Sequence, residues 1–231
     1  AGLMAGITAK RLDKNIQVDI FDINKGIGKK ILASGNGRCN ISNSNITYQN
    51  YIGENPAFVK DALKQFTFKD FEKFCKSIGL LLDVKQTCKV YPLSNEAKSV
   101  VKLLESTCNL LDINLILRTK VENIEKQNDR FELKTQNKRY KDYDKVVISC
   151  GLAAAPQLNA TEMGMDFASK FGHSSNLTYP SLVGLQTDYE QKTRLQGVKK
   201  ESEVTLYIDG NKEISIVGDV LFTKYGVSGF A

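Results

Sequence analysis

Hydrophobic and polar residues alternate with two different periods along the chain, which predicts an α/β domain followed by a β-rich one. Residues 1–12 carry apolar side chains at helical spacing, and the run at 16–21 has the composition of a buried strand. Further helices are predicted over 57–66, 71–77 and about 95–111. The second of these is predicted to begin with a capping box at Thr67–Asp70 and to stop at Gly79. Further strands are predicted over 80–84, 113–117, 182–187, 202–208 and 213–217, with a turn at Asp209-Gly210-Asn211 between the last two.

The sequence pattern changes at about residue 178, which places a domain boundary near residue 177. Three short strands between residues 119 and 140, joined by polar turns, predict an antiparallel meander. Val146 to Cys150 shows no polar alternation, which predicts a strand buried on both faces. We therefore predict a Rossmann-like domain with a parallel sheet over 1–177, including a helical insertion at about 45–79. Residues 178–231 are predicted to begin an inserted β-rich domain.

The first 22 residues have the order of the second half of a dinucleotide-binding βαβ unit. Small residues in the first helix permit close packing on a sheet, and the strand after it ends in Asp22. Asp22 lies twenty residues after Gly2, the spacing of the acid that hydrogen-bonds a ribose after a G-x-G-x-x-G turn. The first strand and two glycines of that unit would precede Ala1, so the chain is expected to be a piece of a longer one. The alternatives are an ordinary small-residue helix on a sheet and an exposed acid at the end of a strand.

The segment from Gly28 to Asn43 combines glycines, cations and short polar side chains directly after that strand. Glycine lets a backbone approach a ligand closely, and free N–H groups with lysine or arginine meet an anion. A solvated loop needs no such composition. The segment therefore predicts a loop that wraps a phosphate-bearing cofactor.

Composition and charge narrow the functional class. The net charge of +6 suits a pyrophosphate or a polyanionic substrate, although a lysine-rich surface explains it as well. Basic and aromatic residues do not alternate as in an RNA-binding platform. Five cysteines without a C-x-x-C pair indicate reduced thiols and no metal site, and the single His173 argues against Ser-His-Asp or zinc catalysis. No apolar run approaches the ~20 residues of a membrane span, so no membrane partner is expected.

Several segments resemble, in order, the BaiN/YhiN-like flavoproteins, also described as aminoacetone oxidase-like. The most specific is Ser34-Gly35-Asn36-Gly37-Arg38-Cys39-Asn40, preceded by Gly28-Lys29-Lys30. The supporting segments are Lys89–Ser94, Val146–Gly151, Gly172-His173, Pro180–Val183 and Leu221–Gly229. The chain departs from the family pattern at Lys89, Leu152 and Lys224. Members of the family run past this C-terminus and return there to the flavin domain.

The resemblance implies a bacterial, cytoplasmic, FAD-dependent oxidoreductase with a two-dinucleotide-binding fold, reduced by NAD(P)H. It implies that the helix N-terminus and the turn after residue 150 meet the pyrophosphate, that residue 121 meets adenine through its backbone, and that residues 34–40 line the flavin. The predicted cofactor-binding residues are Gly2, Asp22, Gly28, Lys29, Lys30, Ser34, Gly35, Asn36, Gly37, Arg38, Cys39, Asn40, Val121 and Gly151. No catalytic acid or base can be named from the sequence.

Alternatives stay open for individual residues. Lys29 and Lys30 can each be solvated, and Arg38 can fix its own loop by bonding backbone carbonyls. Cys39 has no resolving partner at redox spacing, so we interpret it as a small packing residue and not as a redox thiol.

Alternatives also stay open for the function. A small carbonyl, amine or enone substrate is favoured, a base in structured RNA is the second possibility, and a degenerate FAD-holding protein is the third. The oligomeric state is not predicted.

Overall fold

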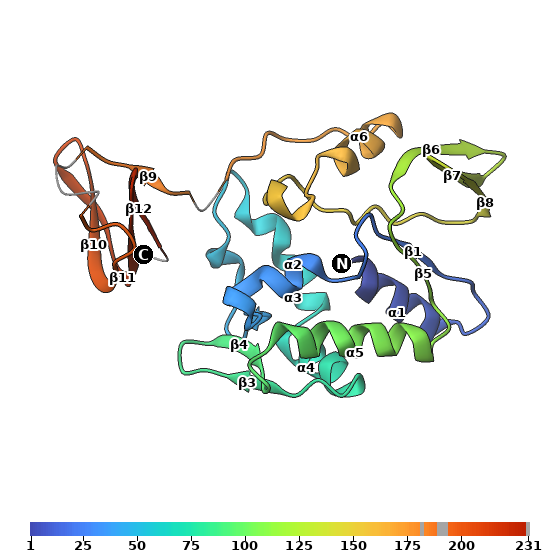
Figure 1. The fold of residues 1–231 in the computed structure, drawn as a ribbon, viewed down its shortest axis with the longest axis horizontal. Helices are drawn as coiled ribbons and strands as arrows, with labels where there is room; N and C mark the ends of the chain where they lie inside the picture. The colour runs from blue at the N-terminus through green and yellow to red at the C-terminus, as the bar shows by residue number, and fades with distance from the viewer. Residues whose placement is uncertain (181–182, 189–193, 230–231) are drawn as a thin grey trace. The chain divides into compact units, whose positions relative to one another are not determined.

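A computed structural model of the chain describes residues 1–180, 183–188 and 194–229. It divides into two compact units, residues 1–175 and residues 176–231 (Figure 1). Within the described residues, no helix is both long enough and apolar enough to cross a membrane.

The first unit is built around a helix and a parallel strand pair. Helix α1 (Gly2–Leu12) packs on strand β1 (Asp19–Phe21), which pairs in parallel with β5 (Asn114–Ile116). The close approach requires a small residue: a Cβ built on Gly6 would lie 3.0 Å from Ile20 Cδ1. The predicted helix–strand unit is therefore present, with a strand that is shorter than the run at 16–21.

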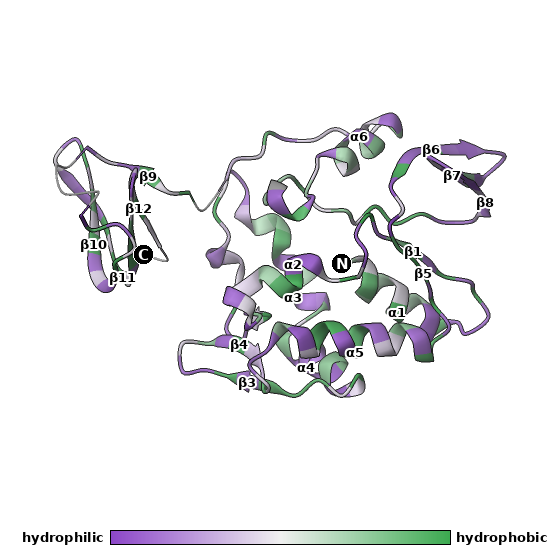
Figure 2. Cartoon of the chain, viewed as in Figure 1, coloured by the Kyte–Doolittle hydropathy of each residue, from purple (hydrophilic) through white to green (hydrophobic). Residues whose placement is uncertain are grey.

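Helix α5 (Ala97–Leu110) and a small antiparallel sheet complete the core of this unit. Apolar and polar residues alternate along α5 (Figure 2), and its apolar side contributes Val100, Leu104 and Cys108 to the main buried cluster. The sheet has the order β2-β4-β3, formed by β2 (Ser42–Asn43), β4 (Lys89–Pro92) and β3 (Leu82–Val84). Ile7 of α1 belongs to the same cluster and has no exposed surface.

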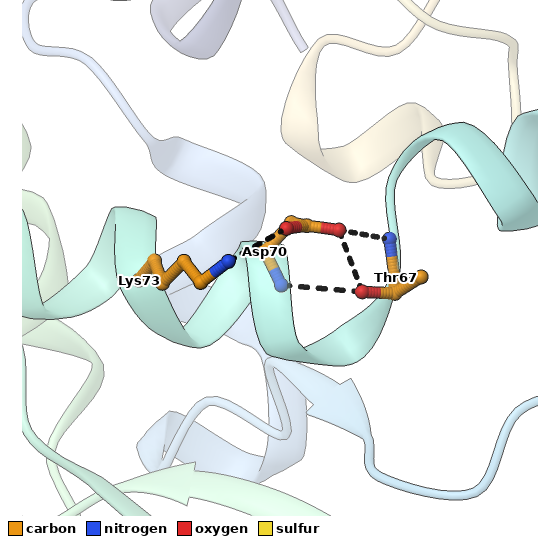
Figure 3. A network of polar contacts seen from close by, with 3 residues as sticks. All are labelled: Thr67, Asp70 and Lys73. Atoms are coloured by element: carbon orange, nitrogen blue, oxygen red, sulfur yellow. Dashed lines mark hydrogen bonds and ion pairs between the residues drawn. The ribbon is translucent and has the colours of Figure 1, made fainter.

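The predicted helical insertion consists of short helices between β2 and β3. It contains η2 (Tyr48–Asn50), η3 (Pro56–Val59), α3 (Lys60–Gln65) and α4 (Phe68–Ser77). The predicted capping box begins α4: Asp70 N–H donates to Thr67 Oγ1 at 3.4 Å, and Thr67 N–H donates to Asp70 Oδ2 at 3.0 Å (Figure 3). Gly79, with φ +77°, follows the end of α4.

The predicted meander forms a three-stranded antiparallel sheet. Its strands are β6 (Val121–Gln127), β7 (Arg130–Thr135) and β8 (Arg139–Tyr143). A second buried cluster, formed by Ile124, Leu133 and Phe167, joins this sheet to α6 (Met163–Lys170).

The prediction of a buried strand at Val146 to Cys150 is wrong in this structure. The segment has no strand pairing, and Val147 is 68% exposed. A strand forms only where a neighbouring strand completes its ladder of hydrogen bonds. Among the described residues, β1 pairs in parallel with β5 and not with residues 146–150. The first unit also contains the short helices α2 (Lys29–Ala33), η1 (Ser34–Gly37) and η4 (Pro156–Leu158).

The second unit is a four-stranded antiparallel sheet of order β10-β11-β12-β9. Its strands are β10 (Lys199–Ile208), β11 (Asn211–Thr223), β12 (Gly226–Gly229) and β9 (Leu185–Gln186). The predicted turn at Asp209-Gly210 joins β10 to β11, and both residues adopt positive φ. Position 182, the first of the predicted strand at 182–187, falls outside the described residues.

Candidate functional site

Asp22 lies at the carboxyl end of β1 and is held by its neighbours. Its N–H donates to Ile116 carbonyl at 3.1 Å, and its Oδ1 accepts from the N–H and the side-chain amide of Asn24 at 2.8 and 2.9 Å. Within the described residues its Oδ2 has no hydrogen-bond partner. One oxygen thus fixes the carboxylate, and the other is available to a hydroxyl group.

Val121 lies near the same end of β1. Thr119 N–H donates to Asp22 carbonyl at 3.0 Å, which brings the chain just before β6 alongside residue 22. The side chain of Val121 packs in the second cluster with Phe21. The structure therefore brings together the two residues predicted for the adenosine half of a cofactor.

Two glycines and one lysine meet at the segment that follows residue 148. A Cβ built on Gly2 would lie 2.5 Å from Ser149 Oγ, and one built on Gly151 would lie 2.8 Å from Lys30 Nζ. Lys30 Nζ also donates to Leu152 carbonyl at 3.4 Å. The N-terminus of α1, where the helix dipole favours an anion, thus lies next to Ser149, and a cation lies beside the glycine turn two residues later.

The loop after α2 has a backbone that glycine and asparagine permit. Gly35, Asn36, Gly37 and Cys39 all have φ between +55° and +82°. A Cβ on Gly35 would lie 2.7 Å from the backbone nitrogen of Asn40, so this glycine is needed for the turn itself. Among the described residues other than Gly37 and its two chain neighbours, no atom lies within 4 Å of a Cβ built on Gly37, which leaves that face of the loop open to a ligand.

Other residues of the loop have roles within the protein. Gly28 (φ +72°) begins α2, and a Cβ there would lie 2.7 Å from Val101 Cγ2 on α5, so it permits helix packing. Ser34 Oγ donates to Ile31 carbonyl at 2.7 Å. Arg38 Nε donates to Gly35 carbonyl at 3.3 Å, and its guanidinium lies 5.6 Å from the ring centre of Tyr91. The loop-fixing interpretation of Arg38 is therefore supported.

Cys39 belongs to the core. It is 2% exposed within the main cluster, and burial raises the pKa of its thiol despite an opposing hydrogen bond with Ser34. A protonated, buried thiol is a packing group, so only the backbone of this residue can face a cofactor. Lys29 makes no polar side-chain contact within the described residues, whereas Lys30 makes the contacts described above.

The residues present fit a dinucleotide. The glycine turn at residue 151, the α1 N-terminus and Lys30 suit a pyrophosphate, and the open side of Asp22 suits a ribose. Sequence reasoning missed Ser149, which could have been found from its place just before Cys150-Gly151, and Asn24, for which the sequence carries no signal. Among the described residues, no His, Cys, Asp and Glu side chains gather as a metal site would require.

Comparison with known proteins identifies the class and then the family. The helix, parallel strand pair and meander define a Rossmann-like α/β domain joined to a β-rich region. Residues 1–227 match the model of the HI0933-like protein Rossmann domain, and the chain belongs to that family. The resemblance seen in the sequence and the predicted fold class are thereby confirmed.

Three curated relatives cover 99% of this chain. It is 31% identical to the 3-dehydro-bile acid delta(4,6)-reductase of Clostridium scindens. It is 32% and 28% identical to the ribosomal RNA dihydrouridine synthases of Haemophilus influenzae and Escherichia coli. The chain spans 56–57% of the length of these relatives.

Proposed function

We propose that this chain forms the FAD-binding part of an NAD(P)H-linked oxidoreductase. The observation that carries the proposal is a pair of neighbouring contacts: Ser149 lies against Gly2 at the N-terminus of α1, and Lys30 lies against Gly151 two residues later along the same segment. Family membership and a reductase among the relatives support the oxidoreductase class.

The predicted site residues have roles in this proposal, except Gly28, which permits helix packing, and Lys29, which makes no polar side-chain contact among the described residues. Gly2, Gly151 and Lys30 hold the pyrophosphate, Asp22 accepts a hydrogen bond from the ribose, and the Val121 backbone meets adenine. Residues 34–40 lie along the ribityl chain and one face of the ring, with Gly37 on the open side of the loop. FAD, when bound, supplies two-electron transfer, while the chain orients it and provides charge complementarity.

Small-molecule reduction is the first candidate for the substrate class, because the bile acid reductase acts on a small molecule by name. Reduction of an RNA base is the second, favoured by the two relatives named as ribosomal RNA dihydrouridine synthases and by the net charge of +6. A cytoplasmic location accords with either candidate.

The first test is the visible absorption spectrum of the full-length protein, followed by anaerobic titration with NADH and NADPH. We expect bands near ~370 and ~450 nm that bleach with a nicotinamide donor, as flavin enzymes show. A protein that stays colourless after addition of FAD would refute the proposal and favour a degenerate protein that does not bind the cofactor. Bound flavin that neither donor bleaches would refute the NAD(P)H part alone.

The two substrate classes separate in a second measurement on the reduced protein. Reoxidation by structured ribosomal RNA, weakening steeply with salt, would favour the RNA base. Reoxidation by small enones or carbonyl compounds, with little dependence on salt, would favour the small molecule.

A further inference from the structure

A pocket of about 410 Å³ lies in the helical insertion, apart from the residues proposed for FAD. Its apolar walls are Ile46, Leu63, Phe66 and Phe68. The volume falls within the range of roughly 300–1,000 Å³ typical of small-molecule sites. Phe66 keeps 45% of its surface exposed, so an aromatic face is available to a ligand.

Of the polar side chains that line the pocket, Ser44 and Thr67 already form hydrogen bonds within the protein. Ser44 Oγ donates to Cys88 carbonyl at 3.4 Å, and Thr67 Oγ1 donates to Asp70 Oδ2 at 2.6 Å. Within the part of the chain that the structure describes, the Asn45 side-chain amide and the Lys69 ammonium have no hydrogen-bond or ion-pair partner. Both present N–H donors, which complement an anion with oxygen acceptors.

Lys69 differs from the two lysines on the second half of α4, because both of those form ion pairs. Lys73 pairs with Asp70 at 3.3 Å, and Lys76 pairs with Glu72 at 3.7 Å (Figure 3 shows the first pair). Asp70 is therefore already shared between the capping box and Lys73, and Lys69 has no carboxylate partner among the described residues.

Both sides of the pocket are held in place. The capping box fixes the start of α4, and with it the backbone of Thr67 and Lys69. On the opposite side, Ser44 N–H donates to Cys88 carbonyl at 2.9 Å, and Asn45 N–H donates to Asn43 Oδ1 at 2.8 Å. A preformed pocket loses less conformational freedom when a ligand binds.

We propose that this pocket binds a small amphipathic organic anion. Its apolar or aromatic body lies against Phe66 and the other apolar walls, and its carboxylate or sulfonate accepts hydrogen bonds from Asn45 and Lys69. The pocket uses none of the residues proposed for FAD, so its ligand can be tested independently of the flavin.

The test uses two fluorescent probes that differ in charge, titrated into the full chain. The first is 8-anilinonaphthalene-1-sulfonate, and the second is the uncharged N-phenyl-1-naphthylamine. We expect Lys69→Gln to weaken binding of the sulfonate roughly tenfold and to leave the neutral probe unchanged, because a hydrogen bond to a charged group is lost. Lys69→Arg restores sulfonate binding, and Phe66→Ala weakens binding of both probes.

Matched controls lie outside the pocket. Lys76→Gln removes a cation from the same helix, and Phe58→Ala removes an exposed ring from the same insertion; neither should change the affinity for either probe. Sulfonate binding that is unaltered in Lys69→Gln or in Phe66→Ala would overturn the proposal. So would the absence of saturable sulfonate binding to the unmodified chain.

Discussion

Replacing Lys30 with glutamine tests the proposed pyrophosphate position most directly. The Lys30 ammonium lies beside the Gly151 turn and donates to Leu152 carbonyl at 3.4 Å, and the side chain as a whole is exposed. Lys29 is its neighbour on α2 and makes no comparable contact, so Lys29→Gln is the matched control. Both changes remove one positive charge from the same helical turn.

The expected magnitude follows from the exposure of Lys30. A cation about 4 Å from a phosphate oxygen contributes about 1 kcal/mol in bulk water and about 4 kcal/mol at an effective dielectric constant of 20. Because Lys30 is exposed, its contribution lies toward the lower value, about 1–2 kcal/mol. FAD should therefore bind roughly five- to thirtyfold more weakly to Lys30→Gln.

The assay is titration of the FAD-free full-length protein with FAD at several salt concentrations, monitored by the quenching of flavin fluorescence. Lys30→Gln should raise the Kd and flatten its dependence on salt, while Lys29→Gln changes neither. An unchanged Kd in Lys30→Gln, or an equal loss in both variants, would refute the assignment of the pyrophosphate to this lysine. Circular dichroism spectra that match the parent protein exclude unfolding as the cause.

Other predictions concern the stability and the thiols of the first unit. Ile7→Ala removes a side chain with no exposed surface and should cost about 2–5 kcal/mol in urea unfolding; a loss below that range would contradict the packing described. Thr67→Ala removes the side-chain cap of α4 and should cost about 1 kcal/mol in the same assay. Hydrogen bonds from Thr67 lower the pKa of Asp70 in the folded protein. Ionised Asp70 therefore contributes its full stabilisation above the ordinary carboxyl pKa, and this contribution is lost as the pH falls through the lower pKa of the folded state. Asp70→Asn should remove this part of the decrease in unfolding free energy at acid pH. Burial raises the pKa of Cys75 to about 12, so in the native protein iodoacetamide at pH 8 should label exposed Cys150 well before Cys75, as peptide mass spectrometry would show.

Local signals in the sequence predicted the elements that depend on neighbouring residues. The cap at Thr67, the stop at Gly79 and the turn at Asp209-Gly210 all occur where short-range chemistry indicated them. The helix–strand–acid order at the start of the chain was also correct, because amphipathic spacing and a terminal acid are local features.

Predictions that needed a distant partner fared differently. The run Val146 to Cys150 has the composition of a buried strand but lacks strand pairing, because a ladder depends on a neighbour and not on composition. The choice between Lys29 and Lys30 also remained open until the contact with residues 151–152 distinguished them.

By itself, the sequence determined the fold class, the family and the loop that combines glycines with cations. Periodicity, caps and glycine positions act over a few residues and can be read along the chain. Only the tertiary structure decided that Cys39 packs in the core, that Arg38 is held within its own loop, and that Gly2 meets Ser149. The packing of Cys39 depends on burial, and Arg38 is held by the Gly35 carbonyl of its own turn and by the ring of Tyr91 on β4. Gly2 meets Ser149 between segments more than a hundred residues apart, a contact that the local order of residues does not encode.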